Sequence, residues 1–132
     1  MKGVGARISG GVTIGSKVRC DDNSGAKLLR VIAKRGHSGR RKRRAVIGVG
    51  SIFFASVIEG KAEMQKKIVR AVLIRQRQPY RRKTGETIKF EDNAAVLVTE
   101  KNEPQGSEIK GIVAKEVGER YPKVSTISKN VI

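Results

Sequence analysis

The sequence predicts a mainly β fold, a small closed β-barrel of about five short strands followed by one or two short helices. Short apolar segments recur along the chain with the two-residue period of strands. Clusters of glycine, asparagine and aspartate separate these segments as turns. The three- and four-residue steps typical of a helix appear near the C-terminus. With 132 residues, the chain is expected to form a single domain, and closure of the barrel would hide its strand edges.

The first two strands are predicted to form a hairpin. Apolar and polar residues alternate over residues 12–20 and again over 29–34, with the turn cluster Asp22-Asn23-Ser24-Gly25 between them. The oxygens of Asp21, Asp22 and Asn23 suit a metal ion, but a structural role in the turn is the favoured interpretation. Cys20 falls on the inward side of its strand and is expected to be a small buried apolar residue.

Three more apolar runs are predicted to be strands. Residues 51–58 are rich in β-branched and aromatic side chains, which favours a strand buried on both faces. Gly48-Val49-Gly50 before this run is interpreted as a turn. Residues 68–74 and 94–99 are the next two strands, and Phe54 and Phe90 are assigned to the core.

The segment 75–83 is expected to extend outward from the 68–74 strand. Thr84-Gly85 supplies the turn of a second hairpin, which returns through Ile88 and Phe90. Farther on, apolar residues at steps of three and four over 112–127 predict one or two short helices, with Pro122 ending one or starting the next.

The net charge is the strongest functional signal. The chain carries 29 Lys and Arg against 12 Asp and Glu, a net charge of +17, and such a balance favours a polyanionic partner. Residues 1–85 hold 22 basic and 4 acidic side chains, whereas residues 86–132 hold 7 and 8. The first two-thirds are therefore expected to meet the polyanion, and the last third another partner. A membrane is not expected, because the sequence has neither an eighteen-residue apolar run nor a basic amphipathic helix.

Two basic clusters, residues 34–44 and 75–83, are the predicted nucleic-acid contacts. Clustered cations bind nucleic acid by releasing its condensed counterions, and the planar fork of arginine suits phosphate. Tyr80 is a candidate for stacking on an unpaired base. A solvated charged surface and, for residues 34–44, a nuclear-localisation patch are the alternative interpretations. The predicted RNA-binding residues are Lys34, Arg35, Arg40, Arg41, Lys42, Arg43, Arg44, Arg75, Arg77, Tyr80, Arg81, Arg82 and Lys83.

The sequence indicates no catalytic constellation, cofactor or metal centre. A glycine-rich stretch over residues 10–17 resembles a phosphate-binding loop, but Ser16 and Lys17 stand in reversed order and a strand follows instead of a helix. Cys20 is the only cysteine and His37 the only histidine, so neither a multi-cysteine zinc site nor a catalytic triad is supported. The chain is therefore expected not to be an enzyme.

Several motifs together resemble one family over nearly the whole chain. They are the turn segment 20–27, the segment 49–52, the arginine-rich stretch 72–77 with 80–85, Phe90-Glu91-Asp92-Asn93-Ala94, and the stretch 106–116. The chain resembles the ribosomal protein L-fourteen family of the large ribosomal subunit, in its archaeal and eukaryotic branch. It departs from the family pattern at Ser51, where aspartate is usual, and at Ile112, where proline is usual.

The basic residues and the glycines of residues 1–11 predict a flexible basic arm. The resemblance implies a five-stranded barrel with a projecting hairpin and a helical C-terminal part over 112–132. It also implies a place in the cytoplasmic ribosome, binding to large-subunit rRNA, contacts with neighbouring ribosomal proteins, and inter-subunit bridges to small-subunit rRNA. An anti-association factor is expected to dock on the C-terminal region. The alternative function is an RNA-binding translation factor or RNA chaperone of the OB type. The expected protein-partner residues are Val113, Lys115, Glu116, Arg120, Tyr121 and Lys123.

Overall fold

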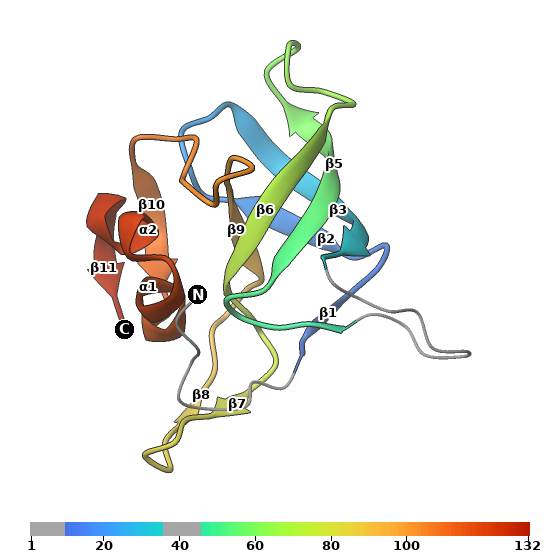
Figure 1. Ribbon diagram of the computed structural model, residues 1–132. Coiled ribbons are helices and arrows are strands. Elements are labelled where there is room, and N and C mark those ends of the chain that lie inside the picture. The colour runs from blue at the N-terminus through green and yellow to red at the C-terminus, as the bar shows by residue number, and fades with distance from the viewer. Residues whose placement is uncertain (1–9, 36–45) are drawn as a thin grey trace.

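A closed barrel of five strands forms the centre of the molecule, as the sequence predicts (Figure 1). The computed structural model describes residues 10–35 and 46–132. Within them the barrel strands follow the order β2-β3-β5-β6-β9, and the parallel pairing of β2 with β9 closes the ring. The other neighbours in the barrel are antiparallel. The strands are β2 (Lys17–Cys20), β3 (Ala26–Lys34), β5 (Ile52–Gly60), β6 (Ile68–Arg75) and β9 (Ala94–Leu97).

The predicted strand over 12–20 is divided into two. β1 (Val12–Thr13) pairs with β4 (Val46–Ile47) outside the barrel, and β2 begins only at Lys17. Between them a tight turn, in which the Ser16 N–H donates to the Thr13 carbonyl at 3.1 Å, places Gly15 at a φ of 92°. The alternation of apolar residues does not reveal this break, because Val12 and Val18 are both buried on either side of it.

The second predicted hairpin is confirmed. β7 (Tyr80–Arg81) pairs with β8 (Thr87–Ile88), and the Gly85 N–H donates to the Arg82 carbonyl at 2.9 Å. Gly85 has a φ of 96°, which a glycine adopts without strain. The hairpin projects away from the barrel, at the bottom of Figure 1.

The C-terminal part is only partly helical. Two helices, α1 (Lys115–Arg120) and α2 (Pro122–Ile127), confirm the prediction, and Pro122 begins the second of them. They are flanked by two strands, β10 (Ile109–Val113) and β11 (Ser128–Val131), which pair in parallel. The prediction of a helical region over 112–132 was therefore wrong at both ends. In β10 the buried residues Ile109 and Val113 lie four residues apart. This spacing fits a helix as well as it fits an irregular strand, so the sequence pattern does not distinguish the two.

Two apolar cores share the central strands. One fills the barrel and includes Leu29, Phe53 and Leu73, and the other lies between the barrel wall and the C-terminal helices. Alternate residues of β6 enter different cores: Leu73 faces the barrel interior, whereas Val72 and Ile74 face the helices. This double burial explains why β6 and β9 appear in the sequence as continuous apolar runs.

Neither of the two phenylalanines assigned to the core is fully buried. Phe90 packs at the edge of the core beneath the C-terminal helices and is half-buried. Phe54 is also half-buried, and the guanidinium of Arg70 lies 5.7 Å from its ring centre. Over the described residues, no helix has the length and apolar character needed to cross a membrane.

The barrel core should dominate the stability of this unit. We expect Leu73→Ala to lower the free energy of unfolding by about 2 to 5 kcal/mol, because Leu73 is completely buried and its truncation leaves a cavity. Ile68→Ala on the same strand is the matched control, since Ile68 is 72% exposed. Urea unfolding of both variants measures the difference, and equal effects would contradict the assignment of the core.

Candidate nucleic-acid interface

The projecting hairpin and its base present three exposed cations. Arg77 precedes β7, Arg81 lies on it, and Lys83 lies in the turn that follows. Asn93 fixes the backbone here, because its Oδ1 accepts from the Arg77 N–H at 2.8 Å. Among the residues that the structure describes, no carboxylate pairs with Arg77, Arg81 or Lys83. Their charges are therefore available to a partner.

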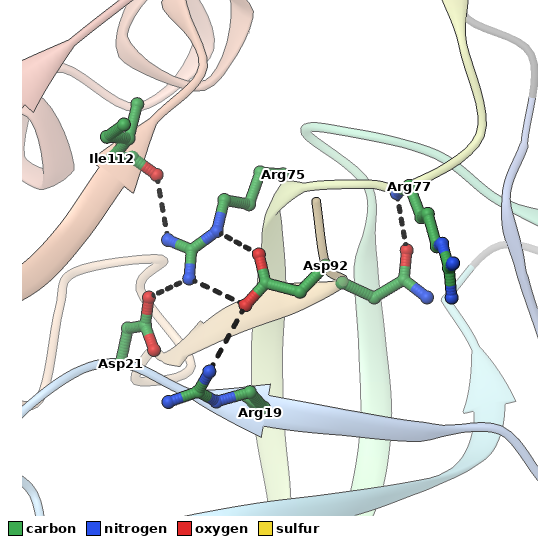
Figure 2. A network of polar contacts seen from close by, with 7 residues as sticks. Arg19, Asp21, Arg75, Arg77, Asp92 and Ile112 are labelled. Atoms are coloured by element: carbon green, nitrogen blue, oxygen red, sulfur yellow. Dashed lines mark hydrogen bonds and ion pairs between the residues drawn. The ribbon is translucent and has the colours of Figure 1, made fainter. Parts of the chain in front are cut away.

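Arg75 occupies the opposite situation, inside the protein. Its Nε and Nη2 bind the two carboxylate oxygens of Asp92 at 2.7 and 3.1 Å, and Nη2 also pairs with Asp21 at 2.5 Å (Figure 2). Nη1 donates to the Ile112 carbonyl of β10 at 3.0 Å. Only 8% of the residue is exposed, so its predicted role as an RNA contact is not supported. Arg75, which ends β6, instead connects three other parts of the chain. These are the end of β2 through Asp21, the segment before β9 through Asp92, and β10 through Ile112.

The charges in this network hold one another ionised. Hydrogen bonds from Arg75 lower the pKa of the Asp92 carboxyl, and the positive charges of Arg75 and Arg19 act in the same direction. Burial acts to lower the pKa of the Arg75 guanidinium, but its bonds to Asp92 and Asp21 outweigh burial and raise it. Arg19 lies at the solvent side of the network, 3.5 Å from Asp92 (Figure 2).

Tyr80 and Arg82 attach the hairpin to α1 through Glu116. The Tyr80 hydroxyl donates to Glu116 Oε2 at 2.8 Å, and Arg82 Nε donates to Oε1 at 2.6 Å. Burial raises the pKa of the Tyr80 phenol, and its bond to Glu116 adds to that rise. Tyr80 is 2% exposed, so the prediction that it stacks on a base was wrong. Glu116 is likewise buried and committed to internal bonds rather than to a protein partner.

The first basic cluster is described only at its start. Arg40, Arg41, Lys42, Arg43 and Arg44 lie outside the described residues, as do His37 and most of the predicted basic arm.

Lys34 ends β3, and its Nζ donates to the Val46 carbonyl at 3.0 Å. Arg35 is exposed, and its backbone N–H donates to the Ile52 carbonyl at 3.2 Å. These two residues share a groove with Arg120 and Tyr121, which were expected to contact a protein partner.

Few of the expected protein-partner residues reach the surface. Val113 and Tyr121 are buried in the core beneath the helices, because β10 and the α1–α2 junction pack against the barrel. Lys115 and Lys123 are exposed, and Lys123 pairs with Glu103. Lys129 of β11, which the sequence did not single out, is also exposed and pairs with Glu108 at 2.6 Å.

The acidic turn after β2 is structural, as favoured. Asp22 Oδ1 accepts from the Ser24 hydroxyl at 2.6 Å, and its Oδ2 accepts from the Leu97 N–H of β9 at 2.9 Å. The Cys20 thiol donates to the same carboxylate, and burial raises the pKa of that thiol, which keeps it protonated. Across the described ranges, no group of three or more potential metal-ligating side chains occurs.

Comparison with known proteins connects this arrangement to one family. The family model described as Ribosomal protein L14p/L23e matches residues 11–132. The large ribosomal subunit protein uL14 of Picrophilus torridus is 48% identical over 132 residues, which is 100% of both chains. The proteins of the same name from Thermoplasma acidophilum and Methanococcus vannielii are 46% identical over 132 residues and 48% over 129, covering 100% and 98% of both chains. The chain therefore belongs to the ribosomal protein L14p/L23e family.

Proposed function

We propose that this protein, a structural constituent of the large ribosomal subunit by its family, binds large-subunit rRNA through its exposed, unpaired cations. Arg77, Arg81 and Lys83 carry the proposal, because no described carboxylate neutralises them. Each phosphate that such a side chain neutralises releases a condensed counterion, which favours binding to RNA. Lys34 and Arg35 extend the same function to the end of β3, where the predicted cluster 34–44 begins. The role is structural rather than enzymatic, as in the family.

The internal ion pairs support this function by fixing the hairpin before RNA arrives. Glu116 holds the hairpin through Tyr80 and Arg82, and Asp92 holds the adjoining end of β6 through Arg75. Contacts on a rigid element lose less conformational freedom on binding than contacts on a free loop. Folded RNA, which presents phosphates at fixed positions, is the partner that benefits most from such an arrangement.

The C-terminal surface is a separate part of the proposal. The exposed side chains of α1 and α2, among them Lys115 and Lys123, are available to neighbouring ribosomal proteins, to small-subunit rRNA across the interface, or to an anti-association factor. The last third of the chain carries 7 basic and 8 acidic residues, so its overall charge is far closer to balance than that of the first two-thirds.

The arrangement of aromatic side chains disfavours the alternative, an OB-type factor that binds single strands. Such binders stack successive bases on exposed aromatic rings. Here Phe53, Tyr80 and Tyr121 are buried, and Phe54 is half-buried beneath Arg70. Sedimentation of the subunit in high salt separates the two functions, because a structural constituent stays bound and a factor dissociates.

Loss of hairpin cations should weaken the salt-dependent part of RNA binding. For Arg81→Ala and Lys83→Ala we expect lower affinity for a large-subunit rRNA fragment and a plot of log affinity against log salt that is shallower by up to about one unit per lost phosphate contact. Lys67→Ala, which removes an exposed charge from the β5–β6 connection, is the control. Slopes that match those of the wild type and the control would exclude the hairpin as a phosphate contact.

The buried Glu116 should matter far more than the exposed Glu86, although both lie near Arg82. We expect Glu116→Gln to lower the free energy of unfolding by about 1.5 to 3 kcal/mol, because charge-assisted hydrogen bonds to Tyr80 and Arg82 are lost. Glu86→Gln removes the same charge from a carboxylate 4.0 Å from Arg82 and 67% exposed, so an effect below about 1 kcal/mol is expected. Urea unfolding and hydrogen exchange at the Gly85 amide measure both variants, and equal exchange rates would refute the anchoring role.

The RNA-binding surface of the hairpin and the surface of α1 and α2 should be separable by mutation. We expect Lys115→Glu combined with Lys123→Glu to impair joining of the subunits or docking of an anti-association factor, while incorporation into the large subunit remains intact. Gradient sedimentation of subunits and joined ribosomes measures both outcomes. Parallel loss of incorporation and joining would contradict the proposed separation.

A further inference from the structure

Three neighbouring strands of the barrel carry apolar side chains that no part of the described chain covers. Ile32 of β3 is 42% exposed, Ile58 of β5 is 37% exposed and Ile68 of β6 is 72% exposed. Strands β3 and β5 lie on the side of the barrel away from α1 and α2 (Figure 1). Single exposed apolar residues are common on protein surfaces, but three on adjacent strands form a patch of the kind that marks a contact site.

The strand register places cations among these apolar side chains. Arg30, Ser56 and Ile68 lie opposite one another across β3, β5 and β6. In the adjacent row, Phe54 of β5 lies opposite Arg70 of β6. Residues two apart on a strand share a face, so the two rows belong to one surface. We call this surface the outer face, and its apolar and charged residues are Arg30, Ile32, Phe54, Ile58, Ile68 and Arg70.

The two arginines of the outer face have no acidic partner among the described residues. Arg30 is exposed. Arg70 is half-buried, and its Nη1 donates to the backbone carbonyl of Glu100 at 3.0 Å rather than to a carboxylate. Arg75 and Arg82, by contrast, are neutralised by carboxylates inside the protein. The outer face therefore combines uncovered apolar surface with uncompensated positive charge, and an acidic partner is complementary to it.

The apolar component of the outer face favours a protein over RNA as that partner. Isoleucine side chains gain free energy only when other apolar surface covers them. Proteins that bind single-stranded RNA stack its bases on exposed aromatic rings, whereas Phe54 is half-buried and the guanidinium of Arg70 lies 5.7 Å from its ring centre. Both edges of β3, β5 and β6 are paired within the barrel, so a partner docks through side chains rather than as an added strand.

We infer that the outer face docks an acidic, amphipathic segment of a neighbouring protein in the large ribosomal subunit. Apolar side chains of that segment cover Ile32, Ile58 and Ile68, and its Asp or Glu side chains pair with Arg30 and Arg70. This surface is distinct from the hairpin, to which the proposed function assigns RNA, and from α1 and α2. The inference depends on the place of the family in the large subunit and not on RNA binding by the hairpin.

Photo-cross-linking in assembled large subunits tests the inference. The full chain carrying Ile68→Cys is labelled with benzophenone maleimide before reconstitution. The label is selective, because Cys20 is the only natural cysteine and burial raises the pKa of its thiol. We expect a cross-link that survives ribonuclease, to a peptide containing apolar residues and Asp or Glu. A cross-link that ribonuclease removes, or no cross-link from incorporated chains, would overturn the inference, and Ile58→Cys provides a second labelling site if the first label prevents incorporation.

Charge reversal tests the acidic character of the partner. Arg30→Glu, added to the labelled chain, should lower the cross-link yield per incorporated chain at least about twofold, because like charges then face each other. Lys110→Glu, which reverses an exposed charge on β10, is the matched control and should leave the yield unchanged. Equal yields from both variants would contradict an acidic partner. A label at Arg81→Cys tests the proposed function separately, since a hairpin that forms no ribonuclease-sensitive cross-link would count against RNA binding there and leave the outer face unaffected.

Discussion

Arg75 carries a positive charge into a site where its side chain is only 10% exposed, and the fold depends on the two carboxylates that hold it there. Asp21 lies at the end of β2 and Asp92 just before β9, so the ion pairs join the two strands whose parallel pairing closes the barrel. The bond to the Ile112 carbonyl extends the same guanidinium to β10. A buried charge that loses one partner is strongly destabilising, because water cannot replace it. Arg75 thus contributes both to barrel closure and to attachment of the C-terminal part.

The need to neutralise buried arginines explains part of the uneven distribution of charge between the basic first two-thirds of the chain and its near-neutral last third. The near-neutral last third of the chain suggests a surface for protein partners, yet its acids Asp92 and Glu116 neutralise Arg75 and Arg82 of the basic part. Some of the acids that balance this region therefore serve the interior. Cations that are neighbours in the sequence also differ in their environment. Arg81 and Lys83 are exposed, whereas Arg82 binds the buried Glu116.

The local patterns of the sequence predicted the barrel and both hairpins, because strand periodicity and turn glycines act over a few residues. They did not reveal β10 and β11, whose parallel pairing joins residues about twenty apart along the chain. Nor could they show that Tyr80 is buried, since its partner Glu116 lies 36 residues away. The groove lined by Arg35, Arg120 and Tyr121 combines a turn residue, a strand end and a helix end, and only the tertiary fold brings Arg35 to Arg120. A sequence shows which residues are charged. Whether a charged side chain points into the protein or toward solvent depends on such long-range contacts.

A protein with a net charge of +17 resists compaction through its own repulsion, and the position of its few acids decides where that repulsion is relieved. Asp21, Asp92 and Glu116 stand at the junctions between barrel, hairpin and C-terminal helices. Among the described cations, Arg77, Arg81 and Lys83 stay exposed at the hairpin, where solvent screens their charges. The internal pairs relieve part of this repulsion within the described fold. Under the proposed function, RNA that binds the folded state would add stability through mass action, and the same contacts would relieve the repulsion among the exposed cations.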